Sequence, residues 1–289
     1  MKNIKNILSI VLLAILSFTA TTAQESDSSL LWKIEGDNIQ TSYVFGTVHM
    51  ISKDEFILKE SVKKAFAATE LLVLELDMDD PGMQSEMMKY VSLPEGEQLK
   101  NHMDEKEYEI LDTYFQKSMG VGMAQFDKMK PFMVSTMVMM GHLGTNMTSY
   151  EANFVTLAQE QQKEIKGLET VAFQMGIFDN QSYEQQIDDI IQLLDEDGSM
   201  KTFFDNLTEV YLSEDIEAIH SSLNEYFSYD KAFEKAILDD RNEDWIPKIG
   251  NYSKDQTVFY GVGSGHLGGK NGVISLLKEA GYKVTPVLD

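Results

Sequence analysis

Apolar and polar positions along the chain alternate between short strand patterns and long helical ones. Residues 31–34 and 41–45 flank the turn-forming run Gly36-Asp37-Asn38, which predicts a β-hairpin near the N-terminus. Residues 71–77 form an apolar run interrupted only by Glu75 and Asp77. Such a run is typical of a strand that is buried on both faces. The two carboxylates are two positions apart, so in a continuous strand they would point to the same side.

Helical spacing dominates the rest of the chain. It predicts a helix that begins near Ser52 or Asp54 and ends at residue 68, and long helical stretches over residues 82–162 and 183–249, with Pro131 beginning one helix. Strand patterns recur at residues 164–170, 257–262 and 283–287, and a last helix is expected over residues 271–280 with Gly281 as its cap. Strands separated by helices predict an α/β fold, in which helices cover a mostly parallel central sheet and a long helical region lies in the middle of the chain.

The first 23 residues have the pattern of a secretory signal peptide. Lys2 and Lys5 precede an apolar run over residues 7–18, and Thr21 and Ala23 occupy the −3 and −1 positions before Gln24. We therefore expect an exported protein, periplasmic or secreted, with one α/β domain over residues 24–289. It should have no stable membrane insertion after signal cleavage. The alternative is that residues 1–23 stay attached as an N-terminal anchor.

Composition narrows the partners and the chemistry. The formal net charge is −23, and a surface this acidic repels nucleic acid and anionic membranes, so we expect no nucleic-acid partner. The charge itself does not identify the partner, which we expect to be a peptide or small-molecule substrate. The chain contains no cysteine, which removes thiol nucleophiles and thiolate ligands. Any metal site must therefore use His, Asp or Glu side chains.

Two copies of a Gly-x-x-His motif follow strand patterns far apart in the sequence. One runs from Gly46 to His49 and the other from Gly263 to His266. Sites in parallel sheets form just beyond the carboxyl ends of the strands. His49, Asp77, Glu169 and His266 are expected at or just past such ends, with Glu75 slightly inside its strand. Histidine can offer a neutral nitrogen to a metal or exchange a proton near neutral pH. The motifs therefore predict a shared site; the alternative is two hydrogen-bonded histidines in the core.

Arg241 is the only arginine, beside 23 lysines. A planar, permanently charged fork can bind a carboxylate or an oxyanion in a way that lysine cannot reproduce, so Arg241→Lys should impair function with little change in melting temperature. The alternative is a surface ion pair with Asp239, Asp240 or Glu243.

Eight methionines fall between Met119 and Met147, several of them at helical spacing. They form either a stripe of core residues or an adaptable apolar groove for a ligand.

Several short segments together resemble the TraB/GumN family, which is related to the Tiki metalloproteases and more distantly to erythromycin esterases and haem-binding ChaN-type proteins. The segments are residues 31–34, Gly46-Thr47-Val48-His49, Leu74-Glu75-Leu76-Asp77, Lys130-Pro131-Phe132, Gly167-Leu168-Glu169-Thr170 with Gln174, Arg241-Asn242, Gly263-Ser264-Gly265-His266 and residues 281–287. The resemblance implies a site built from the two motif histidines, the strand glutamates and the arginine. In the Tiki branch such a site is associated with divalent-metal-dependent peptide cleavage.

The sequence thus predicts a metal-dependent hydrolase that acts on peptide bonds. His49 and His266, with Glu75, would hold Mn²⁺, Co²⁺ or Zn²⁺. Whichever of Glu75 and Glu169 is not a ligand would take a proton from water, and Arg241 would stabilise an oxyanion or orient a carboxylate. Two alternatives remain: a non-catalytic binding protein for a peptide or haem-like ligand in the same pocket, and a relative that keeps the fold only for protein contacts.

Overall fold

The central element of the structure is a six-stranded, mostly parallel sheet. The structure is a computed structural model that describes residues 29–195, 199–226 and 230–289, so the predicted signal peptide lies outside the described residues. The strand order is β6-β4-β7-β2-β1-β8. Strands β6, β4, β7 and β2 run parallel, whereas β1 lies antiparallel between β2 and β8. The strands are β6 (Glu164–Gly167), β4 (Leu71–Leu74), β7 (Val258–Gly263), β2 (Ile39–Thr47), β1 (Leu31–Gly36) and β8 (Lys283–Pro286). The predicted α/β class and the N-terminal hairpin are confirmed.

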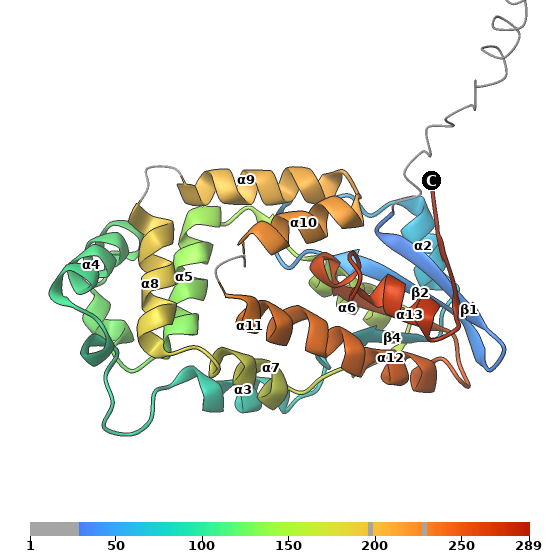
Figure 1. The fold of residues 1–289 in the computed structure, drawn as a ribbon, viewed down its shortest axis with the longest axis horizontal. Coiled ribbons are helices and arrows are strands. Elements are labelled where there is room, and N and C mark those ends of the chain that lie inside the picture. The colour runs from blue at the N-terminus through green and yellow to red at the C-terminus, as the bar shows by residue number, and fades with distance from the viewer. Residues whose placement is uncertain (1–28, 196–198, 227–229) are drawn as a thin grey trace, which may run out of the picture.

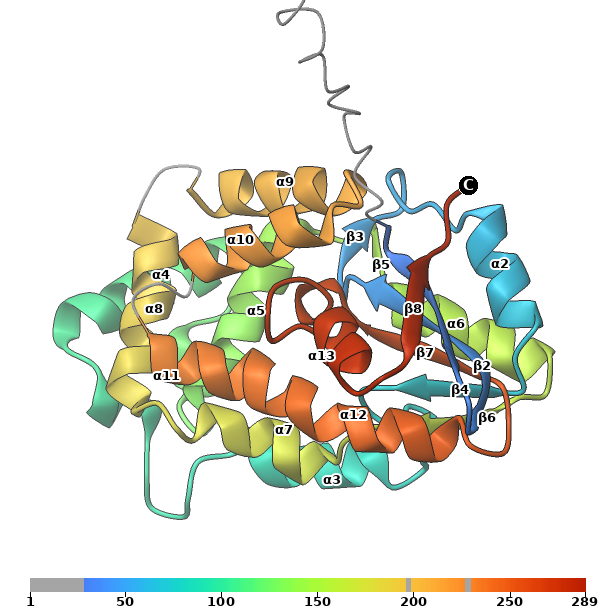
Figure 2. The ribbon, with the colours of Figure 1, turned by 45° about the vertical axis from the view of Figure 1, so that its right-hand side comes forward.

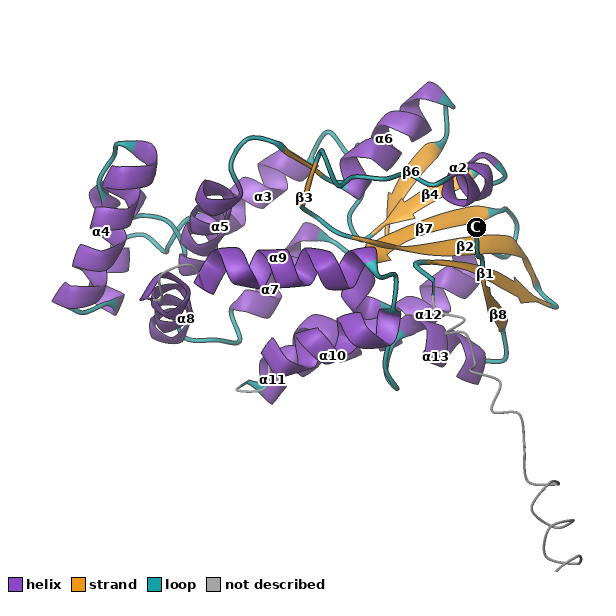
Figure 3. Ribbon diagram, turned by 90° about the horizontal axis from the view of Figure 1, so that it is seen from above, coloured by secondary structure: helices purple, strands orange, loops and turns teal. Residues whose placement is uncertain are grey.

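Helices cover both faces of this sheet. Figure 3 shows α2 (Glu60–Ala67) and α6 (Tyr150–Glu160) on one face, and α12 (Asp240–Tyr252) and α13 (Val273–Glu279) on the other. Neighbouring residues of β7 serve opposite faces: Phe259 packs on Phe66 and Phe154, whereas the hydroxyl of Tyr260 donates to the Ile249 carbonyl of α12 at 2.9 Å. Burial on both faces explains why this strand is apolar throughout.

The other helices extend the molecule away from the sheet. They are α3 (Met83–Val91), α4 (Glu105–Met119), α5 (Pro131–Leu143), α7 (Val171–Phe178), α8 (Tyr183–Asp195), α9 (Ser199–Leu212), α10 (Ile216–Tyr226) and α11 (Lys231–Glu234). Helices α4, α5 and α8 form the end that lies farthest from the sheet (Figure 1) and bury a separate apolar cluster that includes Phe115, Val138 and Ile187. Pro131 is the first residue of α5, as predicted. Within the described ranges, no helix combines the length and apolarity that crossing a bilayer takes.

Three predicted element boundaries are wrong, and one of them is the strand expected over residues 164–170, which ends at Gly167. The helix expected from Ser52 or Asp54 begins only at Glu60, because Ile51–Ser52 forms strand β3 and pairs with β5 (Met147–Thr148). The strand expected over residues 71–77 ends at Leu74. Beyond that residue the amide of Gly263 donates to the Glu75 side chain at 2.8 Å. Competition from a side-chain acceptor thus ends the regular pairing of the strand, and Glu75 and Asp77 lie past it.

Candidate functional site

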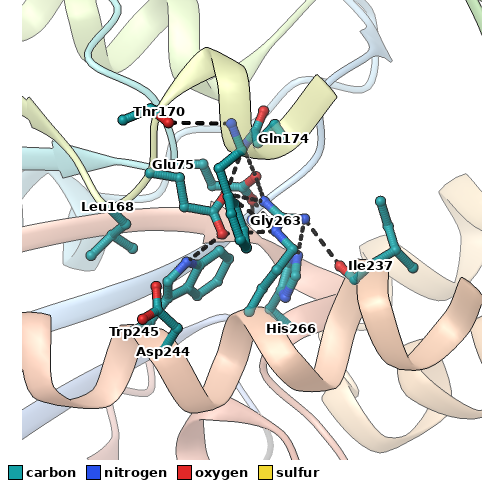
Figure 4. A network of polar contacts seen from close by, with 12 residues as sticks. Glu75, Leu168, Thr170, Gln174, Ile237, Asp244, Trp245, Gly263 and His266 are labelled. Atoms are coloured by element: carbon teal, nitrogen blue, oxygen red, sulfur yellow. Dashed lines mark hydrogen bonds and ion pairs between the residues drawn. The ribbon is translucent and has the colours of Figure 1, made fainter. Parts of the chain in front are cut away.

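The parallel strands end together and deliver four of the predicted side chains to one edge of the sheet. Glu75 follows β4, Glu169 follows β6, and His49 follows β2. His266 ends the short 3₁₀ turn Ser264–His266 that follows β7. Figure 4 shows Glu75, Gln174 of α7, Trp245 of α12 and His266 directed toward one another. Arg241 joins this group from α12, because it donates to Glu75 and Glu169.

Arg241 lies at the centre of the polar network and is only 4% exposed. Its Nε donates to Glu169 Oε1 at 3.0 Å, and its Nη2 donates to Glu169 Oε2 at 2.8 Å and to Glu75 Oε2 at 2.6 Å. Its Nη1 donates to the Ile237 carbonyl at 3.1 Å and to His266 Nε2 at 3.2 Å. All five N–H groups of the guanidinium therefore have acceptors inside the protein. The structure places Arg241 in the interior, and the surface ion pair considered above is not formed.

Glu169 is fully enclosed, with 0% of its side chain exposed. Besides Arg241, its Oε1 accepts from Trp245 Nε1 at 2.8 Å and its Oε2 accepts from Gln174 Nε2 at 3.0 Å. Each oxygen of Glu169 thus accepts from two donors, so both of its lone pairs are occupied. Glu169 is placed to hold Arg241 in position, and it has no oxygen left for a water or a substrate.

Glu75 differs from Glu169 because one of its oxygens has a single donor and its side chain is 12% exposed. Its Oε2 accepts from Arg241 and from Gln174 at 3.1 Å, while its Oε1 accepts only the Gly263 amide at 2.8 Å. Burial by itself raises the pKa of Glu75, but the charge of Arg241 and the Gly263 N–H outweigh it and lower that pKa to about 2. Glu75 is therefore ionised at neutral pH.

The network assigns the tautomer of His266, which is 5% exposed. Asn242 Nδ2 donates to the Asn271 carbonyl at 2.9 Å, so Asn242 Oδ1 is the acceptor that lies 2.7 Å from His266 Nδ1. The proton therefore sits on Nδ1, and Nε2 presents a lone pair that accepts from Arg241. Burial and the charge of Arg241 lower the pKa of His266 to about 3, so the ring is neutral.

His49 reaches the same place from the other side of Gly263. The position that a Cβ on residue 263 would occupy lies 3.3 Å from Glu75 Oε1, 3.5 Å from His266 Cδ2 and 4.0 Å from His49 Nε2. The two motif histidines and Glu75 are thus brought together around one point beside Gly263, which has no side chain there. His49 Nδ1 lies 2.9 Å from Glu151 Oε1, and this hydrogen bond raises the pKa of His49 to about 9.

The chemistry of these side chains fits a divalent cation in donor type. Two imidazole nitrogens and a carboxylate are ligands of Zn²⁺, Mn²⁺ and Co²⁺, and each ring is held through Nδ1 so that Nε2 faces the site, as in ligating histidines. With a pKa of about 9, His49 carries a proton on Nε2 near neutral pH, and a cation would have to displace that proton. As the side chains stand, however, no group of three or more His, Asp or Glu in the described part of the chain could hold a metal ion. A cation would also have to replace the bond from Arg241 to His266 Nε2.

Two other sequence features lie outside this network. Asp77 contacts Asp79 rather than the site, because the strand ends before it. Of the methionine stripe, Met123 is buried, and Met133 and Met137 pack partly buried against apolar clusters, whereas Met140 is 54% exposed. Met129 also packs against an apolar cluster, whereas Met119 is 39% exposed, so four of the eight methionines lie in or against the core.

Sequence reasoning missed two residues that the structure brings into contact with the site. Trp245 lies four residues after Arg241 on α12, a spacing that places both on one helix face and could have indicated it. Glu151 is an acidic residue in the first turn of α6. Such residues are common at helix starts, so the sequence carried no signal for its contact with His49.

The chain as a whole is similar to known proteins. The chain is 23% identical to Metalloprotease TIKI1 of Danio rerio over 91% of its own length and 64% of that protein, and 23% identical to Metalloprotease TIKI1 of Homo sapiens over 90% and 62%. Metalloprotease TIKI2 of Danio rerio is 22% identical over 91% and 61%. The chain therefore spans less than two thirds of the length of these relatives. No solved structure matches it. The sequence pattern of the TraB/PrgY/gumN family matches residues 30–286, nearly the whole chain, and the protein belongs to that family.

Proposed function

We propose that this protein is an exported hydrolase that cleaves peptide bonds with the help of a divalent cation. The observation that carries the proposal is the convergence of His49 Nε2, Glu75 Oε1 and the His266 ring on one point above Gly263. The similarity to proteins named metalloproteases supports the reaction class, at 22–23% identity.

In this proposal His49, His266 and Glu75 hold the cation. A divalent cation bound there supplies Lewis acidity, which polarises a carbonyl and makes water a nucleophile near neutral pH. Glu75 contributes a permanent negative charge, because Arg241 and the Gly263 N–H keep it ionised. Its Oε1 has one lone pair left beside the Gly263 N–H, and this is the lone pair that would bind the cation.

Arg241 and Glu169 act through Glu75 and His266. Since every N–H of Arg241 already has an acceptor, the arginine orients the Glu75 carboxylate and does not wait for an oxyanion. Glu169, Gln174 and Trp245 fix the arginine in turn. Of the two roles considered for Arg241, orientation of a carboxylate is the one we propose, and Glu169 is a positioning residue.

The test uses the mature chain, residues 24–289, with a peptide library and added Mn²⁺, Co²⁺ or Zn²⁺. We expect cleavage that EDTA abolishes and fresh metal restores. Glu75→Gln and His266→Ala should each lower the rate by roughly 100-fold or more, the scale of a lost catalytic contact. His102→Ala is the matched control, because His102 pairs with Glu184 in the helical end of the molecule.

Two results would overturn the proposal. One is cleavage that persists in EDTA and survives both site variants. The other is a protein that binds a peptide or haem through the site residues without turnover, which would favour the non-catalytic binding protein.

A further inference from the structure

Behind His49 lies a carboxylate that the proposed reaction does not use. Glu151 Oε1 lies 2.9 Å from His49 Nδ1 and also accepts a hydrogen bond from the hydroxyl of Thr47, the residue two positions before His49. The Glu151 side chain is 12% exposed, whereas that of His49 is 70% exposed. A ring this exposed has little packing to hold it, so the hydrogen bond to Glu151 is the contact that restricts its rotation.

A small second sheet places this carboxylate. Strand β3 begins two residues after His49, and it pairs with β5 so that Ile51 faces Thr148 and Ser52 faces Met147. Figure 2 shows the two strands side by side, apart from the central sheet. Ser149 then caps α6 by accepting the Ala152 amide at 3.0 Å, and Glu151 falls in the first turn. The pairing therefore fixes the start of α6 against the loop that carries His49.

Two further observations show that Glu151 is built in rather than incidental. A carboxylate is stabilised in the first turn of a helix by the unpaired amides there. Glu151 Oε2 is buried and has no hydrogen-bond partner among the described residues. An unpaired buried oxygen lowers the stability of the folded protein, so Glu151 is kept at some expense in stability, which a role in holding His49 would explain.

The two motif histidines are held by different partners. His266 Nδ1 donates to the neutral amide of Asn242, whereas His49 Nδ1 faces the carboxylate of Glu151. A carboxylate behind the ring makes the opposite nitrogen a better electron donor than an amide does. The more exposed histidine is thus the one with the stronger positioning partner.

We propose that Glu151 is the positioning residue of His49: it holds the ring through Nδ1, directs Nε2 to the point above Gly263, and thereby sets the affinity of the site for a divalent cation. The affinity part of this inference rests on the proposed function. The orientation part concerns the metal-free protein and can be tested separately.

The orientation test uses NMR of the mature chain, with labelled histidine and glycine. In the wild type we expect a nuclear Overhauser effect between the His49 ring and the Gly263 amide. Glu151→Gln should keep it, because an amide oxygen still accepts from Nδ1–H. Glu151→Ala and Glu151→Asp should lose it, since alanine has no acceptor and aspartate is one methylene too short. Glu160→Ala, at the exposed end of the same helix, is the control.

The affinity test titrates Zn²⁺ into the same variants. Glu151→Ala and Glu151→Asp should bind roughly 10–100-fold more weakly than wild type, the usual effect of removing such an outer partner, and Glu151→Gln should fall between. If Glu151 had only a structural role, Glu151→Asp would not bind Zn²⁺ more weakly than Glu151→Gln does. If Glu151→Ala does not fold, the Asp and Gln variants still decide the ranking.

The outcomes separate the two proposals. The positioning role is overturned if the nuclear Overhauser effect between His49 and Gly263 is missing in the wild type, or if it survives in Glu151→Ala or Glu151→Asp. It is also overturned if Glu151→Asp binds Zn²⁺ as tightly as the wild type does. If the orientation results hold but the wild type neither binds metal nor cleaves peptides, the proposed function falls and the positioning of His49 stands.

Discussion

Replacing Arg241 by lysine tests the central network most directly, because it keeps the charge and changes only the geometry. The guanidinium has five N–H groups, all bonded, and an ammonium offers three donors from one point. The side chains involved are enclosed: 5% of Arg241 and 0% of Glu169 are exposed, so solvent cannot replace the lost donors. Lysine must therefore leave acceptors of Glu169, Glu75 or His266 unpaired.

The magnitude follows from these contacts. At least two hydrogen bonds to Arg241 are lost, and bonds to ionised groups contribute about 1.5–3 kcal/mol each. Removing a whole partner from a buried ion pair costs about 3–5 kcal/mol, so a change that keeps the charge should cost about 3 kcal/mol. In a chain of this size, a loss of about 3 kcal/mol lowers the melting temperature by roughly 6–12 °C. This differs from the expectation based on sequence alone, in which stability hardly changed.

Differential scanning calorimetry of the mature chain measures this effect, with Lys254→Arg as a control at an exposed position. Glu169→Gln should destabilise by a similar amount, and the double variant should lose less than the sum of the single ones, because both changes break the same contact. If Arg241→Lys melts within about 2 °C of wild type, the network does not have the enclosed geometry described above, and the reasoning is refuted.

Three further predictions concern neighbouring residues. In EDTA, the free energy of unfolding should fall as the pH drops from 6.5 toward 3, because His266 binds a proton in that range in the unfolded chain but not in the folded one. His266→Gln should make the free energy of unfolding, measured by urea titration, depend less on pH. An unchanged pH dependence would contradict the assignment of a neutral ring. Gly263→Ala places a methyl group 3.3 Å from Glu75 Oε1 and should lower turnover by roughly 100-fold. The control is Gly176→Ala, whose methyl group meets nothing within 4 Å. Equal rates for the two variants would show that the reaction does not use the space above Gly263. Trp245→Phe removes a donor to Glu169 and should cost about 1–3 kcal/mol on thermal unfolding, whereas an unchanged melting temperature would mean that this bond contributes nothing.

Local patterns were sufficient for the architecture. The hairpin, the buried strands and the helix that begins at Pro131 follow from periodicity and turn residues, which depend on near neighbours. The expected position of His49, Glu169 and His266 at strand ends follows from the same patterns, because parallel strands finish at one edge of a sheet. Glu75 was expected slightly inside its strand and lies just past it. Boundaries were less certain: helix α2 begins at Glu60 because β3 pairs with a strand nearly a hundred residues later, and no local pattern encodes that partner.

The sequence by itself determined which residues could take part in chemistry, and the tertiary structure decided what each one does. The isolation of Arg241 in the composition indicated a special role. Only the fold shows that its N–H groups are all used within the protein, and that Glu169 is enclosed while one oxygen of Glu75 has a single donor. The contact of Glu151 with His49, across 102 positions, left no trace in the sequence. Hydrogen bonds between side chains act over about 3 Å, and which groups come that close depends on how the helices and strands pack together.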